Sequence, residues 1–191
     1  GGDVERYFVE WGGKEYLSYG DWLGAPREIR FFTLPRILVR QIVSGNPLRI
    51  YAGYTQEELY NTQTIFNILV KHNSNFNTKI ILAIMNSSLI NFYHAYKYLD
   101  LSKNLFQKIL IQNCKKFPIP KVELNNEGAV VSIIEVVDQI LAAKKQLQQA
   151  TTEGDKNYLN RKCEILDKQI DELVYNLYGL TEEEIKIVEG K

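Results

Sequence analysis

Short runs of bulky and β-branched residues, separated by turn residues, occupy the first third of the chain and are typical of short β-strands. Residues 6–11 alternate polar and bulky side chains, Gly12 and Gly13 predict a tight turn, and residues 15–19 can pair back as the second strand of a hairpin. Further strands are expected at residues 36–43, 48–52 and 64–70. The first of these three is apolar and β-branched, which favours a central strand.

The middle of the chain changes to helical spacing. Asn77 and Thr78 are good helix-capping residues, and the apolar residues that follow as far as Tyr96 recur at intervals typical of one helical face. We therefore expect a helix that begins near Asn77. Residues 105–111 predict a short strand, and the prolines within residues 117–120 predict an extended segment that cannot continue a helix.

The last part of the chain has a helical pattern. Residues 130–141 carry one amphipathic face, residues 151–154 interrupt it, and residues 159–177 repeat apolar positions as along a coiled-coil seam. The short connection favours two helices that fold back antiparallel. Gly179 is expected to cap the second helix, and residues 181–184 form a capping-box start for a last short helix.

Together these elements predict an α+β protein, in which a strand-rich lobe with a packed helix is followed by a long antiparallel α-helical hairpin. The boundary is expected near residue 121. It divides the chain into a lobe of residues 1–120 and a helical arm of residues 121–191.

The formal net charge of zero conceals an asymmetry between the lobe and the arm. Residues 1–120 contain 14 Lys and Arg against 9 Asp and Glu, whereas residues 121–191 contain 9 against 14, so the lobe carries +5 and the arm −5. Six of the seven arginines lie in the first 50 residues. This asymmetry suggests that the lobe meets a polyanion, although chance scatter over a solvated surface would explain the same counts.

Residue patterns typical of catalysis and of metal binding are missing from the sequence. The two cysteines and the two histidines have no partners at metal-ligand spacing, so a zinc site is not expected. No glycine-rich nucleotide loop and no nucleophile elbow occurs. The segment Asn46-Pro47-Leu48 lacks the second proline and the aromatic residue of an adenine-methyltransferase motif. We expect no catalytic residue, no metal and no cofactor in this chain.

The sequence contains neither a run of about 18 apolar residues nor a basic segment followed by an apolar stretch. We therefore expect no membrane span and no secretory signal, and two cysteines without framework spacing fit a reducing cytoplasm. The only methionine is Met85, so the chain is expected to be a piece of a longer protein.

Five segments follow one another in a characteristic order. They are residues 2–7 (GDVERY), 35–40 (PRILVR), 82–93 (LAIMNSSLINFY), 113–120 (NCKKFPIP) and 170–185 (IDELVYNLYGLTEEEI). In this order they resemble the entry strand, core strand, leucine-asparagine-serine helix, proline exit motif and closing helix pair of the TaqI-like C-terminal specificity domain. Two positions depart from that pattern: Met85 stands where leucine is common, and Arg36 where lysine is frequent.

The resemblance implies that this chain is the DNA target-recognition domain of an adenine-specific DNA methyltransferase or of a type IIG enzyme that fuses methyltransferase and endonuclease. Such a domain binds double-stranded DNA next to an N-terminal methyltransferase domain of the parent chain. S-adenosylmethionine, with Mg²⁺ as a further candidate, would belong to that missing catalytic part. The acidic arm would act as a spacer that stays off the DNA, or as a cap on the core of the lobe.

DNA binding requires cationic side chains at phosphates and side chains such as Arg, Asn or Gln at base edges. The basic lobe supplies the candidate contacts, which are Arg6, Arg27, Arg30, Arg36, Arg40, Arg49, Lys71, Asn73, Asn75, Lys115 and Lys116. Because Arg36 and Arg40 are four residues apart on a strand, they share one of its faces. We expect these cations to form one continuous positive face.

Other interpretations of these candidates remain open. Arg6, Arg36 and Arg40 could lie on the sheet surface beside acidic neighbours, and residues 71–75 could be a solvated connection. The whole chain could instead be a protein-interaction scaffold that forms a homodimer through the helical arm. The missing motifs disfavour an independent nuclease or transferase. Salt-dependent binding of duplex DNA would separate the first function from the scaffold.

Overall fold

The strands form a small antiparallel sheet in the lobe. The computed structural model describes residues 2–71, 76–102, 107–120 and 127–191. The central strand β1 (Arg36–Arg40) pairs with β2 (Ala52–Thr55) on one side and with β3 (Ile65–Ile68) on the other. The predicted α+β class is confirmed, as are the central strand and the strand at residues 64–70, each with shorter bounds.

The two faces of β1 have different surroundings, because successive residues of a strand point to opposite sides. Ile37 and Val39 are fully buried and belong to the main hydrophobic core, together with Phe66 of β3. Arg36 and Leu38 point to the other face, where they are buried as well. The sheet is therefore covered on both sides near its centre.

The prediction of a β-hairpin at residues 6–19 is wrong. The chain makes a tight turn within it, since the backbones of Glu5 and Phe8 are hydrogen-bonded to each other and Tyr7 has a φ of 69°. Val4 consequently bridges to Val9, and residues 10–28 contain neither helix nor strand. A positive φ is rare for a tyrosine, so the alternation of side chains could not reveal this turn.

The strand predicted at residues 48–52 is displaced toward the C-terminus. Ser44 bridges to Arg49 across a turn, and β2 begins only at Ala52. The strand predicted at residues 105–111 is reduced to a bridge between Lys108 and Ile42, with its first part outside the described residues. The chain then enters the short helix α4 (Ile111–Cys114), which the sequence did not predict, and α1 (Arg30–Thr33) is a second such helix.

Two helices follow the sheet where one was predicted. The helix α2 (Thr78–Asn86) begins after Asn77, whose side chain accepts a hydrogen bond from the backbone N–H of Lys79, as expected. Ser87 is extended, ends α2 and caps α3 (Ser88–Tyr98) by accepting a hydrogen bond from the N–H of Ile90. A serine can occupy a helix or start one, so the continuous apolar spacing concealed the break.

The predicted helical hairpin is confirmed. It consists of α5 (Glu127–Gln149) and α6 (Glu153–Tyr178), and the last helix is α7 (Glu182–Glu189). Thr152 caps α6, Gly179 ends it in the left-handed conformation, and Thr181 and Glu184 form the predicted capping box.

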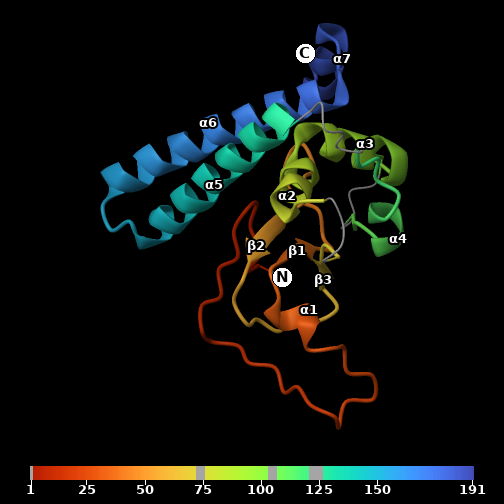
Figure 1. Cartoon of the computed structure of the whole chain (residues 1–191), viewed down its shortest axis with the longest axis vertical. Helices are drawn as coiled ribbons and strands as arrows, with labels where there is room; N and C mark the ends of the chain where they lie inside the picture. The colour runs from red at the N-terminus through yellow and green to blue at the C-terminus, as the bar shows by residue number, and fades with distance from the viewer. Residues whose placement is uncertain (1, 72–75, 103–106, 121–126) are drawn as a thin grey trace.

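The hydrophobic core continues from the sheet into the hairpin. The helix α2 lies between β1 and the α5–α6 pair (Figure 1), and residues of all these elements belong to one buried cluster. The arm contributes Ile133, Val137, Ile140, Ala143, Cys163, Leu166, Ile170 and Val174. Packing of this kind fixes the arm on the lobe. The predicted domain boundary falls outside the described residues and stays a prediction.

The molecule is elongated, and its two ends differ in structure. The irregular segment of residues 10–28 makes a wide excursion at one end of the longest axis, whereas α7 lies at the other end and the α5–α6 hairpin projects sideways (Figure 1). Among the helices described, none has the length and apolar character needed to cross a bilayer.

His94 on α3 is 2% exposed and packs against Tyr98 and Phe117. Burial lowers the pKa of His94 from 6.5 to about 4. Between these two values the unfolded chain binds more protons than the folded chain, so the stability that neutral His94 provides is present above pH 6.5 and lost as the pH falls toward 4.

Replacing His94 with glutamine is therefore expected to make the free energy of unfolding less dependent on pH across this window. Urea unfolding of both proteins at several pH values measures their free energies of unfolding. The carboxylates are the same in both proteins, so their contributions cancel in the difference. Equal pH dependence in the two proteins would contradict a buried neutral histidine.

Candidate nucleic-acid interface

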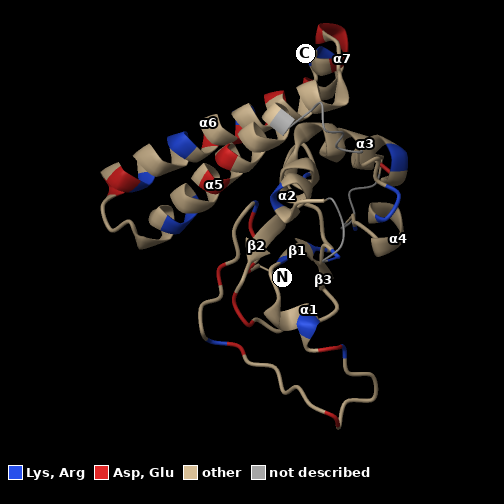
Figure 2. Cartoon of the chain, viewed as in Figure 1, with Lys and Arg blue, Asp and Glu red and all other residues tan. Residues whose placement is uncertain are grey.

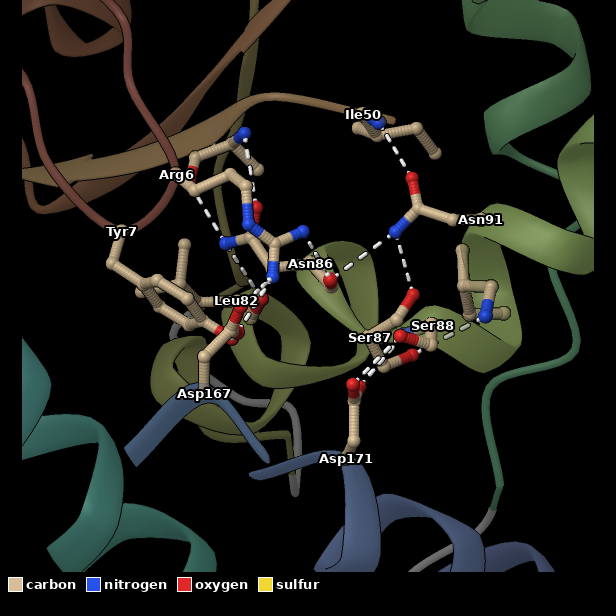
Figure 3. A network of polar contacts seen from close by, with 12 residues as sticks. Arg6, Tyr7, Ile50, Leu82, Asn86, Ser87, Ser88, Asn91, Asp167 and Asp171 are labelled. Atoms are coloured by element: carbon tan, nitrogen blue, oxygen red, sulfur yellow. Dashed lines mark hydrogen bonds and ion pairs between the residues drawn. The ribbon is translucent and has the colours of Figure 1, made fainter. Parts of the chain in front are cut away.

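Arg6 is engaged inside the protein. Its Nη2 atom donates to both carboxylate oxygens of Asp167 on α6 at 2.6 Å, and its Nη1 atom donates to the backbone carbonyl of Asn86 at 2.7 Å (Figure 3). Only 13% of the Arg6 side chain is exposed. The donors that a phosphate would need are already used, so Arg6 is corrected from a DNA contact to a link between the N-terminal segment and the arm.

Tyr7 binds the same carboxylate. Its hydroxyl donates to Oδ1 of Asp167 at 2.7 Å, and the residue is 1% exposed. Burial, with the negative charge of Asp167 in addition, raises the pKa of Tyr7 well above its usual range. The hydroxyl therefore keeps the proton that it donates to Asp167.

Two buried asparagines at the α2–α3 junction bind the backbone next to the sheet. The Asn86 side chain donates to the carbonyl of Ala52 at 2.8 Å and accepts from its N–H at 3.3 Å. The Asn91 side chain accepts from the N–H of Ile50 at 2.5 Å and donates to the carbonyls of Asn86 and Ser87. Hydrogen bonds of this kind hold residues 50–52 in register with α2 and α3.

Asp171 of α6 binds the start of α3. It accepts hydrogen bonds from the backbone N–H of Ser88 at 2.7 Å and from its hydroxyl at 2.6 Å. A carboxylate is favoured at a helix N-terminus. Burial raises the pKa of Asp171, and the hydrogen bonds from Ser88 oppose that shift.

We call these residues the lobe–arm network: Arg6, Tyr7, Asn86, Ser88, Asn91, Asp167 and Asp171. Figure 3 shows that they converge from the N-terminal segment, the α2–α3 junction and α6. Apart from Arg6, sequence reasoning assigned none of them a contact, although Tyr7, Asn86, Ser88, Asn91 and Asp171 lie in segments that carry the family resemblance. The available signal was the position of Asp167 and Asp171 next to the apolar seam residues Leu166 and Ile170.

Arg36 is fully buried in the sheet. Its guanidinium donates to the backbone carbonyls of Leu34 at 2.9 Å, Glu57 at 3.0 Å and Leu59 at 2.8 Å. Three carbonyls therefore replace the phosphate that the sequence suggested, and Arg36 is corrected from a DNA contact to an anchor for residues 57–59.

Arg40 and Arg49 lie near the other end of β1. The Arg40 guanidinium carbon is 4.5 Å from the centroid of the Tyr51 ring, and its Nη2 atom is 3.3 Å from the hydroxyl of Ser44. Arg49 is half-buried and pairs through its backbone with Ser44. Both remain partly accessible, so their DNA contact stays a prediction.

Arg27 and Arg30 are exposed at the end of the irregular segment, before β1 begins. Arg30 forms an ion pair with Glu28 at 2.8 Å, in which its side chain is 57% exposed. An exposed ion pair of this kind contributes little to stability, so a phosphate can compete for the guanidinium.

Lys115 and Lys116 are exposed after α4. Phe117, the next residue, contacts Tyr93 and Tyr98 of α3, and Lys97 of α3 lies over the Tyr93 ring at 4.8 Å. These contacts bring three lysines to one side of the lobe, and we call Lys97, Lys115 and Lys116 the α3–α4 basic patch. Sequence reasoning did not select Lys97.

Lys71 is exposed, whereas Asn73 and Asn75 lie outside the described residues.

The early arginines do not form the single positive face that we expected. Arg6 and Arg36 are internal, and the other four are divided between the two ends of β1. Figure 2 shows basic residues at α1, on the α3–α4 side and among the acidic residues of the α5–α6 hairpin, and further acidic residues on α7 and along the N-terminal segment. The accessible positive charge therefore lies in separate groups.

Metal ligands and thiols are other possible reactive groups in the described part of the chain. There, no three His, Cys, Asp or Glu residues are grouped so that they could hold a metal ion. Burial raises the pKa of the Cys114 thiol to about 11, so this thiol is protonated at neutral pH.

Comparison with known proteins identifies the class. Residues 1–119 match the model of the TaqI-like C-terminal specificity domain, and the chain belongs to this family. Over 178 residues it is 25% identical to a protein of Methanocaldococcus jannaschii that is named "Putative type II restriction enzyme and methyltransferase". That match covers 93% of this chain and 14% of the relative, so the chain spans only a small part of the relative's length.

Proposed function

We propose that this chain recognises the sequence of double-stranded DNA as the specificity domain of a restriction-modification enzyme. The observation that carries the proposal is membership of the specificity-domain family over residues 1–119. The exposed cations of the lobe are suited to the phosphates of DNA.

The proposed phosphate contacts are eight of the lobe cations that the fold leaves exposed or half-buried. They are Arg27, Arg30, Arg40, Arg49, Lys71, Lys97, Lys115 and Lys116. Each such contact releases condensed counterions when the protein binds, so affinity should fall as salt rises. The lobe–arm network would keep these cations in a fixed arrangement relative to the arm.

Charge reversal in the α3–α4 basic patch tests this function. Replacing both Lys115 and Lys116 with glutamate is expected to weaken binding of duplex DNA by about tenfold or more and to lower the slope of log K against log salt by about 2. A mobility-shift titration at several salt concentrations measures both quantities.

The matched control replaces Lys145 and Lys168 with glutamate, because these lysines are exposed on the helical hairpin and the charge change is identical. Its affinity should stay near that of the unchanged protein. Equal loss in both variants would indicate a non-specific charge effect, and failure of the unchanged chain to bind duplex DNA in low salt would overturn the proposal.

At a finer level, we propose that the parent enzyme methylates adenine and is either a separate methyltransferase or a type IIG fusion that also cleaves DNA. Its methyltransferase domain would bind S-adenosylmethionine, and a nuclease part would use Mg²⁺. The name of the relative, which combines restriction and methylation, supports the fusion. Mapping the modified base in DNA treated with the parent enzyme tests this proposal, and cytosine methylation would overturn it.

A further inference from the structure

The irregular segment contains a loop, residues 19–27, whose two ends are hydrogen-bonded to each other, and we call this junction of Tyr19 and Arg27 the neck of the loop. The hydroxyl of Tyr19 donates a hydrogen bond to the carbonyl of Arg27. The Tyr19 ring also lies 5.4 Å from the ring of Phe32 and 5.1 Å from that of Tyr60, measured between centroids. The neck is thereby attached to α1 and to the segment that precedes β3. A loop whose ends are held together in this way can keep a defined shape at its tip.

The tip of this loop presents a tryptophan. The N–H of Leu23 donates to the carbonyl of Gly20 at 3.1 Å, and between them Trp22 is 72% exposed. A Cβ atom on Gly20 would lie 2.1 Å from the Trp22 ring. The indole therefore lies across Gly20, and the missing side chain makes room for it.

Two cations and two carboxylates belong to this region. Arg27 closes the loop and Arg30 follows on α1, with both side chains exposed, whereas Asp21 precedes Trp22 at the tip and Glu28 pairs with Arg30. The loop lies at the opposite end of the molecule from the acidic helix α7 (Figures 1 and 2). Most of the indole surface of Trp22 is left in water by the fold, and the guanidinium groups of Arg27 and Arg30 are suited to phosphates.

We infer that Trp22 enters a groove of the bound duplex and contacts the bases, while Arg27 and Arg30, where the loop joins α1, bind phosphates of the same duplex. The inference rests on the proposed function and adds a base-contacting residue to it. Proteins that bind the minor groove combine cationic side chains with apolar side chains that insert between base steps. In single-stranded nucleic acid, removing an aromatic side chain on which one base stacks weakens binding by about 5- to 150-fold, and we take the same range for Trp22.

Fluorescence of Trp22 tests this contact directly. The chain contains two tryptophans, so Trp11→Phe leaves Trp22 as the only one. Titration with a pool of random-sequence duplexes should quench its emission saturably, at the same DNA concentrations that produce the mobility shift. The reverse variant, Trp22→Phe, leaves Trp11, whose emission should change little.

Binding by loop variants provides the second measurement. Trp22→Ala should bind the duplex pool about 5- to 150-fold more weakly with an unchanged salt slope, whereas Arg27→Glu with Arg30→Glu should lower that slope. Gly20→Ala displaces the indole without removing it and should weaken binding to an intermediate degree. Since Trp22 is largely exposed, thermal unfolding of Trp22→Ala should match that of the unchanged chain.

Constant Trp22 emission together with full affinity of Trp22→Ala would overturn the inference while leaving the proposed function intact. Absence of duplex binding by the unchanged chain would instead overturn the proposed function itself. If Trp22→Ala loses affinity but Trp22 emission does not respond to DNA, the tryptophan does not contact bases, and the inference also fails.

Discussion

Replacing Asp167 with alanine is expected to lower the free energy of unfolding by about 3–5 kcal/mol, because the change leaves a largely buried arginine without its counter-charge. Asp167 accepts from both Arg6 and Tyr7, so a single truncation also removes the acceptor of a buried hydroxyl. Denaturant unfolding, followed by circular dichroism, measures the loss.

The matched control is Asp138 on the neighbouring helix α5. It pairs with Lys79 at 2.6 Å, but 51% of the Asp138 side chain and 28% of the Lys79 side chain are exposed. Its replacement with alanine should cost only about 0–1 kcal/mol. A similar small cost for Asp167→Ala would mean that the lobe–arm network adds little to stability, and that the apolar core alone holds the arm.

A second comparison identifies the charge as the cause. Asp167→Asn keeps the volume of the side chain and one acceptor for Tyr7, but it removes the negative charge opposite Arg6. Most of the loss should therefore persist in this variant. Recovery of nearly full stability would show that hydrogen bonding, and not charge pairing, accounts for the contribution of Asp167.

The helical part of the fold could be predicted from sequence because its determinants are local. Apolar spacing located the faces of α5 and α6, and Thr181 with Glu184 formed the capping box that the sequence indicated. These signals act within one or two turns of a helix. The central strand was equally clear, because residues 37–39 are apolar and buried.

The candidate interface was harder to predict, because a cation in a sequence does not reveal its partner. Arg6 binds a carboxylate 161 positions away, and Arg36 binds backbone carbonyls more than 20 positions away. Both arginines had the composition and spacing expected of DNA contacts. Only tertiary structure separates them from Arg27 and Arg30, which remain accessible.

Charge counts therefore overestimated the binding surface of the lobe. Two of its six arginines bind groups inside the protein, since Arg6 binds the carboxylate of Asp167 and Arg36 binds backbone carbonyls. The accessible cations that remain include the lysines of the α3–α4 basic patch. The same long-range contacts changed the role of the arm. Because Asp167 and Asp171 bind Arg6 and Ser88, the arm contributes to the structure of the lobe in addition to any role as a spacer.

Asn86 should be the next most sensitive residue, since its side chain is fully buried and binds both polar groups of the Ala52 peptide backbone. Replacing it with alanine is expected to lower the free energy of unfolding by about 1–3 kcal/mol, because buried backbone groups lose a partner. Leucine has the same branched shape as asparagine and a somewhat larger volume but makes no hydrogen bonds, so replacing Asn86 with leucine should not restore stability.

Asn160 on α6 provides the control, because it is exposed and its replacement with alanine should change stability by no more than about 0.5 kcal/mol. Hydrogen exchange adds a local measurement. If Asn86 holds residues 50–52 against α2, the Ala52 amide should lose protection in Asn86→Leu by more than the global loss of stability explains. Uniform loss of protection across the lobe would instead show that Asn86 contributes only through packing, and that β2 keeps its position without these hydrogen bonds.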